Sequence, residues 1–417
     1  MRSFLAWFAF SEAERRRVLD LVHSLEERDI RDELGIGTVR DSLADMLFPG
    51  ISIIQTRARY FLFIPWIYRK LEQKKVSSAE IATVARDQEI KLIDALCDNL
   101  GENKGIIGYR AKSELRRLPS EIYWQGLGVW GIRQFNGGRN AYHRSLDRYY
   151  MDAGRKLTAE ETAADVTVRN RNWHDLPTPP ANFPREADFE LTVDEAEYLS
   201  RRILQGSRTR NSFLATLIAR RQVWEPEIEY PWLSPVFEWA TDKQQDQLKH
   251  AETFSLLMLG AALLYNLILC QLRNADSQTK KDSGDEDSDK EYFQSELASW
   301  LIEIEKFRPQ LKSWDRKTFW TLVAEEGQAA DALTLKFCED WFDIAINCKD
   351  AAQLMNANEA AYRLIVMREK DLKGPLSRTT NQQTLKQWGG ESGAFRLSFR
   401  WPKARVIIRD IVGGLNR

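Results

Sequence analysis

A long apolar run occupies residues 253 to 272, where the chain reads TFSLLMLGAALLYNLILCQL. A run of this length is about what a helix needs to cross a bilayer. However, Gly260 and Asn266 interrupt it, and no cluster of basic residues marks a cytoplasmic side. Because a helix that is apolar on all sides belongs in the middle of a bundle, we predict a buried helix and no membrane association.

Two more helices are predicted between residues 38 and 69. Thr38 and Asp41 have the spacing of a capping box, so one helix should begin there and end at the Pro49–Gly50 pair. Ser52 is suited to cap the next helix, which would carry one apolar stripe at 100° per residue. The stripe comprises Ile53, Tyr60, Phe61, Ile64 and Tyr68.

In this register Arg57 lies at the centre of the apolar stripe and Arg59 points elsewhere. A buried guanidinium without a partner costs several kcal/mol. Asp41 and Asp45 are close enough along the chain to supply that partner. Two interpretations stay open if the register is correct: Arg57 forms an internal ion pair, or it reaches a phosphate or other anion in a pocket.

The hydrophobic period changes from helical to alternating near the end of the chain. In FRLSFRW, residues 395 to 401, apolar residues alternate with Arg396, Ser398 and Arg400, which predicts a half-buried strand with a basic outer face. Pro402 then opens a short helix. The stretch from 121 to 135 is predicted to hold a strand pair that turns at Asn136–Gly137, which explains the glycines of GLGVWG without a dinucleotide site.

Two biased segments divide the chain into modules. HDLPTPPANFPRE, residues 174 to 186, holds four prolines and is predicted to be a linker. DSQTKKDSGDEDSDKE, residues 276 to 291, holds seven acids and no large apolar residue, which is typical of a disordered loop. The predicted organisation is an N-terminal helical module with a small β hairpin (1–155), a linker (156–186), a central helical module (187–273), a disordered acidic loop (274–291) and a C-terminal helical module with a terminal strand and helix (292–417).

The fold class that follows is a mainly α, multidomain helical protein with small β elements, in an arrangement that resembles a winged helix. Its 417 residues, 43% of them hydrophobic, are ample for a large core. The 60 basic residues almost cancel the 61 acidic ones, so the net charge gives no argument for a nucleic-acid partner.

The sequence lacks the motifs of several common classes of active site. The four cysteines and four histidines are too scattered for a metal site or a disulfide framework. There is no phosphate-binding GxxxxGK[ST] motif and no secretory signal at the start of the chain. We therefore predict no metal, no cofactor and a cytoplasmic location.

Local charge, in contrast, favours nucleic acid. Residues 105 to 148 carry eight Lys or Arg against three acids, and residues 376 to 417 carry eight against two, both interleaved with aromatic residues. Cations neutralise phosphates while aromatic faces stack on bases. An internal core is the alternative role of those aromatics. The candidate DNA-binding residues are Arg57, Arg59, Trp124, Arg139, His143, Arg144, Arg396 and Arg400.

Three segments resemble a known bacterial family. They are GIGTVRDSLADMLFPGISIIQTRARYFLFIPWIY, RLIVMREKDLKGPLSR and GAFRLSFRWPKARVIIRDIVGGL. The family consists of proteins of unknown function, of about this length, found in genomic neighbourhoods concerned with phage defence. The resemblance implies action on or around invading DNA, with other defence-system proteins as partners, and it supplies no catalytic residue.

The order of a polar residue, a bend and RARYFLF is also similar to winged-helix DNA glycosylases, which remove alkylated or crosslinked bases. Those enzymes carry a glutamine-containing triplet where this chain reads FPG. The similarity implies that Asp41 or Asp45 stabilises the cationic sugar or positions water, Arg57 or Arg59 holds phosphate, and Trp124 fills the gap left by a flipped base. The competing hypothesis is a non-catalytic DNA-binding or scaffold subunit.

Overall fold

A computed structural model describes residues 32–101, 103–155, 171–221, 228–233, 235–277, 286–326, 329–356 and 359–417. The protein is mainly α, as predicted. Contacts divide it into two compact units, which we call unit 1 (Met1–Leu43 and Lys249–Leu397) and unit 2 (Ala44–Leu248 and Ser398–Arg417). The division differs from the three consecutive modules expected from the sequence, because the chain returns to each unit after leaving it.

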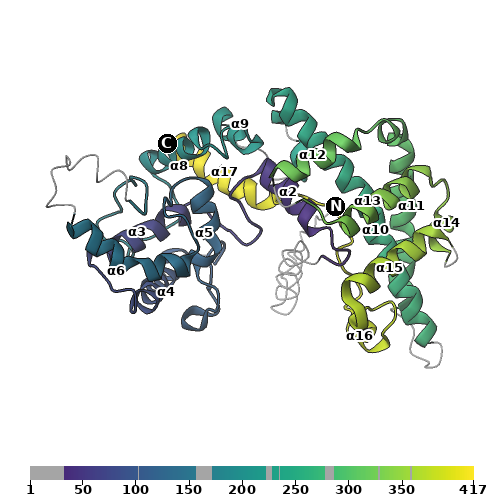
Figure 1. Ribbon diagram of the computed structural model, residues 1–417, viewed down its shortest axis with the longest axis horizontal. Coiled ribbons are helices and arrows are strands. Elements are labelled where there is room, and N and C mark those ends of the chain that lie inside the picture. Colours follow the sequence, from purple (N-terminus) through teal and green to yellow (C-terminus); the bar gives the residue numbers. More distant parts are fainter. Residues whose placement is uncertain are drawn as a thin grey trace, which may run out of the picture. The chain divides into compact units, whose positions relative to one another are not determined.

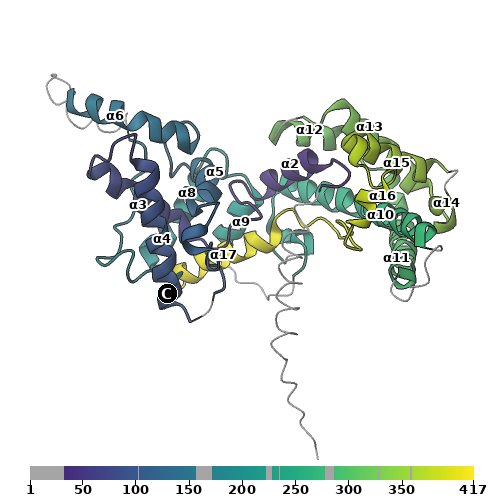
Figure 2. The ribbon, with the colours of Figure 1, turned by 90° about the horizontal axis from the view of Figure 1, so that it is seen from below.

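Unit 2 is built around an aromatic helix. Its helices are α3 (Tyr60–Gln73), α4 (Ile81–Asn99), α5 (Pro119–Val129), α6 (Arg139–Arg155), α8 (Val193–Gln205), α9 (Phe213–Arg220) and α17 (Trp401–Leu415), with short 3-10 turns η1 (Lys112–Glu114), η3 (Pro231–Leu233) and η4 (Pro235–Trp239). Helix α3 packs against α4 and α5, and its Phe61 ring stacks on Trp130 at 3.9 Å between centroids. Helix α17 packs on α8 and α9 (Figure 1 and Figure 2).

Local signals explain where α8 and α9 begin. Thr192 and Glu195 form a complete capping box at the start of α8, and the Ser212 side chain accepts the backbone N–H of Ala215 at the start of α9. Between these helices lies a short turn, residues 206 to 212. The turn therefore has fixed ends on both sides.

Unit 1 is a bundle around α10 (Asp242–Ser277), which crosses the boundary between the units, as α2 (Gly37–Leu47) does. Its other elements are α11 (Glu286–Lys312), α12 (Arg316–Glu326), α13 (Ala332–Asn347), α14 (Ala351–Met355), α15 (Ala360–Lys373), η5 (Gly374–Leu376) and α16 (Gln382–Lys386). Helix α10 is the one helix in the described ranges that is long and apolar enough to cross a membrane, but 83% of its apolar window is buried. Such burial is typical of a core helix.

The two residues that interrupt the apolar run of α10 both have packing roles. A Cβ atom on Gly260 would lie 2.2 Å from the Trp300 ring of α11, so only glycine leaves room for that indole. The Asn266 side chain donates to the Ser392 carbonyl at 2.8 Å and accepts the Ser392 N–H at 2.7 Å. Asn266 thereby fixes the loop that follows α16.

Several predicted boundaries change. Helix α2 ends before Pro49, as expected, but Asp32 accepts the N–H groups of Ile36 and Gly37 at its start in place of the predicted Thr38 cap. Helix α3 begins at Tyr60, so the register that placed Arg57 within a helix beginning near Ser52 is wrong. Arg57 lies in the irregular segment before α3.

The predicted β elements are also wrong. Helix α5 occupies most of 121 to 135, and the only β feature in the described ranges is a single bridge between Arg133 and Trp173. Residues 395 to 398 have no regular structure, and Phe399 and Arg400 have φ values of 51° and 69°, which turn the chain into α17. Alternating apolar residues can therefore also occur in an irregular segment, and by themselves they do not indicate a strand.

The linker and the acidic loop need corrected limits. Residues 171 to 186 pack onto unit 2, where Trp66 donates to the Pro177 carbonyl at 2.8 Å and Phe183 stacks on Phe63. Helix α10 extends to Ser277 and α11 starts at Glu286, so both ends of the predicted acidic loop are helical. Residues 156–170 and 278–285 lie outside the described ranges.

Candidate functional site

Arg57 and Arg59 both form internal ion pairs in unit 2. Arg57 donates from Nε and Nη2 to Asp410, at 2.9 and 2.8 Å. Arg59, whose side chain is 5% exposed, pairs with Asp188 and with Glu195, the latter at 2.8 Å. The geometry matches the ion-pair interpretation of Arg57, with Asp410 as partner in place of the aspartates of α2.

Asp41 and Asp45 do not share a pocket. Asp41 is half exposed and accepts a hydrogen bond from Arg40. Asp45 pairs with Arg400, whose guanidinium also donates to the Ile51 carbonyl at 2.8 Å. Neither carboxylate is among the lining residues of the two pockets described below.

The remaining predicted arginines differ in their ion pairing and in their exposure to solvent. Arg396 pairs with Glu303 at 2.9 Å in unit 1, so it shares no strand face with Arg400 of unit 2. Arg139 pairs with Glu121. Arg144 is exposed on α6 and is the predicted cation that remains most open to solvent.

His143 is part of the aromatic core. It is 5% exposed, lies 3.2 Å from the Tyr68 hydroxyl and stacks on the same ring. Burial, together with the nearby charge of Arg139, lowers the pKa of His143 to about 4. The imidazole is therefore neutral at pH 7 and offers no charge to a phosphate.

Trp124 lies at a pocket in unit 2 that sequence reasoning did not anticipate. The pocket has a volume of about 410 Å³ and lies beside the segment from 133 to 138. Its lining contains two arginines, three side-chain amides and no acid. The lining residues are Trp124, Gln125, Gly128, Val129, Arg133, Gln134, Phe135, Asn136, Gly137, Gly138 and Arg208.

Arg133 is held in this pocket by neutral groups alone. Its guanidinium donates to the carbonyls of Trp124 at 3.2 Å and Gly137 at 2.9 Å, and also to that of Phe135. It lies over the Trp124 ring, 5.1 Å from the centroid. Burial lowers the pKa of Arg133, and no carboxylate pairs with it in the described ranges. The pocket thus contains a half-buried cation without a counter-charge.

The start of α6 borders the same pocket. The Gly138 carbonyl accepts the N–H of Tyr142, so Gly138 stands at the cap position and provides no side chain to satisfy the first N–H groups. A Cβ on Gly138 would meet nothing within 4 Å. The partial positive charge of the helix start adds to the field of Arg133 and Arg208.

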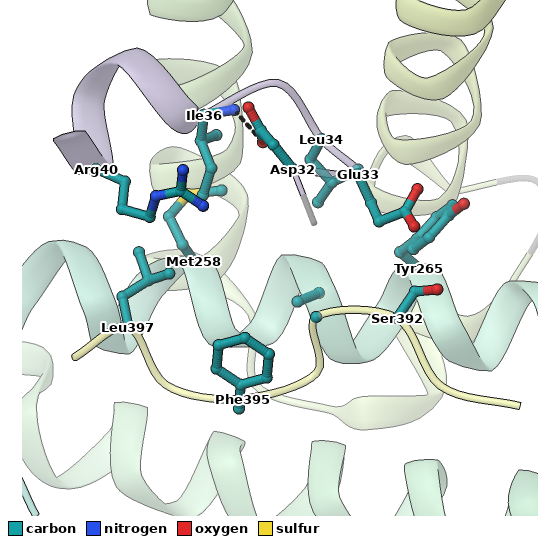
Figure 3. Close-up of a pocket in the computed structure, with 12 residues that line it drawn as sticks. Asp32, Glu33, Leu34, Ile36, Arg40, Met258, Tyr265, Ser392, Phe395 and Leu397 are labelled. Atoms are coloured by element: carbon teal, nitrogen blue, oxygen red, sulfur yellow. Dashed lines mark hydrogen bonds between the residues drawn. The ribbon is translucent and has the colours of Figure 1, made fainter. Parts of the chain in front are cut away.

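A separate, smaller pocket lies in unit 1 (Figure 3). It has a volume of about 40 Å³, with Glu33, Tyr265 and Ser392 at one end and Arg40 and Leu397 at the other. That volume holds little more than one or two water molecules. The pocket therefore lacks the room for an organic ligand.

Beside that pocket, the buried Glu369 carboxylate organises the loop after α15. It accepts the Tyr265 hydroxyl at 2.7 Å, the Ser377 hydroxyl at 2.8 Å and the Thr379 N–H at 2.9 Å. These bonds hold the pKa of Glu369 at about 2, although burial alone would raise it. Glu33, Lys373 and Arg378 complete a cluster of two acids and two bases, and three of its four members come from the RLIVMREKDLKGPLSR segment.

Comparison with family models shows where this chain belongs. The family of unknown function DUF6361 matches residues 2–413. The chain belongs to this family. No curated protein and no solved structure matches it. The family therefore covers nearly the whole chain and leaves the chemistry to be argued from the site.

The arginines near the pocket belong to a basic stretch that lies outside residues 105 to 148 and 376 to 417, whose charges were counted above. Residues 198 to 221 hold six arginines and no acid, which is more basic residues without an intervening acid than either stretch considered above contains. Within it, Arg202 donates to the carbonyls of Trp130 and Gly131, while Arg208 lines the pocket. No group of three potential metal ligands occurs in the part of the chain that the structure describes.

Proposed function

We propose that this protein binds DNA through the arginine-rich α8–α9 segment of unit 2. The observation that carries the proposal is the acid-free stretch from 198 to 221, where five of the six arginines are exposed: Arg201, Arg208, Arg210, Arg220 and Arg221. None of these five forms an ion pair within the described ranges. The remaining arginine, Arg202, is partly buried and hydrogen-bonded to carbonyls.

Exposed arginines without acidic partners favour phosphate contact. Such side chains neutralise backbone phosphates and release counterions, which gives affinity that depends on salt and little on sequence. The contrast with Arg57, Arg59 and Arg139 is informative, because each of those guanidinium groups is already neutralised by a carboxylate. The resemblance to proteins found near phage-defence genes favours invading DNA as the target.

A binding role is better supported than base excision. Excision needs a carboxylate or similar group facing the sugar, whereas the pocket lining contains none. Asp45 is bound by Arg400 and Asp41 is half exposed beside Arg40. A glycosylase therefore remains the alternative proposal, and abasic-site formation on phage DNA is the measurement that favours it.

The test of DNA binding is the triple variant R201Q/R210Q/R221Q, which removes three exposed cations that do not line the pocket. Affinity for DNA of any sequence should fall, and the slope of log K against log salt should drop by up to about three ions. The matched control K317Q/K336Q/K370Q removes the same charge from exposed positions of unit 1. Equal effects of both variants, or none from either, would exclude specific contact at α8–α9.

A further inference from the structure

We infer that the pocket of unit 2 between α5, the start of α6 and the α8–α9 turn binds a phosphomonoester, namely the terminal phosphate of a DNA strand. The inference rests on the proposed DNA binding and adds a specific ligand group to it. It concerns the pocket lining, and of the five exposed arginines behind the proposed function only Arg208 belongs to that lining.

The pocket lining has two positive charges and no acid. Arg133 is fixed by three carbonyls, which orient a guanidinium without neutralising it. Arg208 lines the same pocket and forms no ion pair within the described ranges. Arg133 is half-buried and Arg208 is exposed, so an anion in the pocket would be attracted by two cations and would meet no carboxylate of the lining.

The available donors match a phosphate with several free oxygens. Within the described ranges the hydrogen bonds of Arg133 use Nε and Nη1, which leaves Nη2 available as a donor. The amides of Gln125, Gln134 and Asn136 line the same space. The start of α6 adjoins this lining at Gly138, and its partial positive charge also favours an anion. A phosphomonoester has about −1.5 to −2 charge at pH 7, so it suits two arginines better than a singly charged diester does.

The size of the pocket restricts how DNA can present that group. A volume of about 410 Å³ falls in the range of small-ligand sites and admits one nucleotide, not a duplex. Arg133 covers the open face of Trp124, so a base has no free indole face on which to stack. The role of Trp124 is then to support the arginine, and recognition falls on the phosphate.

The experiment compares the same short DNA strand with a 5′-phosphate, a 3′-phosphate or hydroxyl ends, at fixed salt. The wild-type protein should bind one phosphorylated strand at least about tenfold more tightly than the hydroxyl strand, as for a few charge-assisted hydrogen bonds. dAMP and inorganic phosphate, added separately as competitors, show whether a free phosphate serves as well as a strand end.

The key variant is Asn136→Asp, which places an acid in the pocket without changing side-chain size. An acid just before α6 favours the helix, so the fold should be retained, yet the preference for phosphorylated ends should fall to about twofold or less. Gln383→Glu, in the first turn of α16 in unit 1, is the matched amide-to-acid control and should keep the preference. Arg133→Met should also abolish it.

The outcomes separate the two proposals. Loss of end preference in Asn136→Asp but not in Gln383→Glu supports the pocket. Equal wild-type affinity for all three strands overturns the inference and leaves DNA binding at α8–α9 standing. Failure of the wild type to bind any strand, with dAMP binding that Asn136→Asp weakens, keeps a phosphomonoester site but rejects the strand end and the proposed function. Competition by inorganic phosphate that Asn136→Asp does not change also overturns the inference.

Discussion

Glu89 is a carboxylate of α4 with no exposed surface. One oxygen accepts the Ser120 N–H at 2.8 Å, and the other has no hydrogen-bond partner among the residues that the structure describes. Desolvation raises the pKa of Glu89 to about 7. Because folding raises this pKa, the folded state binds the proton more tightly, and that stabilisation is complete below the unfolded pKa and is lost as pH rises through about 7.

We therefore expect the free energy of unfolding to fall by about 2–3 kcal/mol between pH 5.5 and pH 8 on account of this group. Glu89→Gln should remove most of that dependence and be more stable than the wild type at pH 8. Urea unfolding at both pH values measures the effect. Glu114→Gln, at an exposed position of η1, is the control and should leave the dependence unchanged.

Arg57→Met should destabilise unit 2 by about 2–3 kcal/mol at pH 7, because it leaves the buried Asp410 carboxylate without its cation. The double variant R57M/D410N removes the stranded charge and should recover part of the loss. Thermal unfolding measures both. Equal stability of Arg57→Met and wild type would contradict an energetic role for the pair.

The sequence predicts that Arg57 needs an acidic partner, but it does not identify that partner. The cost of burying a guanidinium indicated that Arg57 must be paired. Its partner Asp410 lies 353 positions away, and no local pattern connects the two. The role of Arg133 could not be predicted from the sequence, because its partners are backbone carbonyls. Every residue has a carbonyl, so no pattern of side chains indicates such a contact.

At the scale of elements, Gly260 gives a sharp test of packing in α10. Gly→Ala within a helix normally stabilises by about 1 kcal/mol, but here the added methyl would lie 2.2 Å from Trp300. Gly260→Ala should therefore destabilise by at least about 1–3 kcal/mol. Gly413→Ala in α17, where a Cβ meets nothing within 4 Å, is the matched control and should be neutral or stabilising in urea unfolding.

Helices were more predictable than irregular segments. The apolar run of α10 and the end of α2 follow from period and proline position, and both are found. FRLSFRW failed as a strand because alternation is a weak signal without a partner strand, and within the described ranges no strand is present to pair with it. The positive φ values at Phe399 and Arg400 could not be foreseen, because neither residue favours that conformation.

At the scale of the whole molecule, each unit has its own buried core. We expect two unfolding transitions in urea, with Gly260→Ala shifting the one that reports unit 1 and Arg57→Met the one that reports unit 2. Hydrogen exchange resolved by peptide assigns each transition to its residues. A single transition shifted equally by both variants would contradict independent cores.

The packing of α17 on α8 and α9 has a consequence for synthesis of the chain. Residues 44 to 248 are made before Lys249–Leu397 of unit 1, whereas Ile407 and Ile411, buried in the finished unit 2, are made only after it. At about 5–20 residues per second, the growing chain waits roughly 7 to 30 s for them. During that interval the apolar sides of α8 and α9 that will receive α17 are uncovered, which makes nascent unit 2 a natural client for a chaperone.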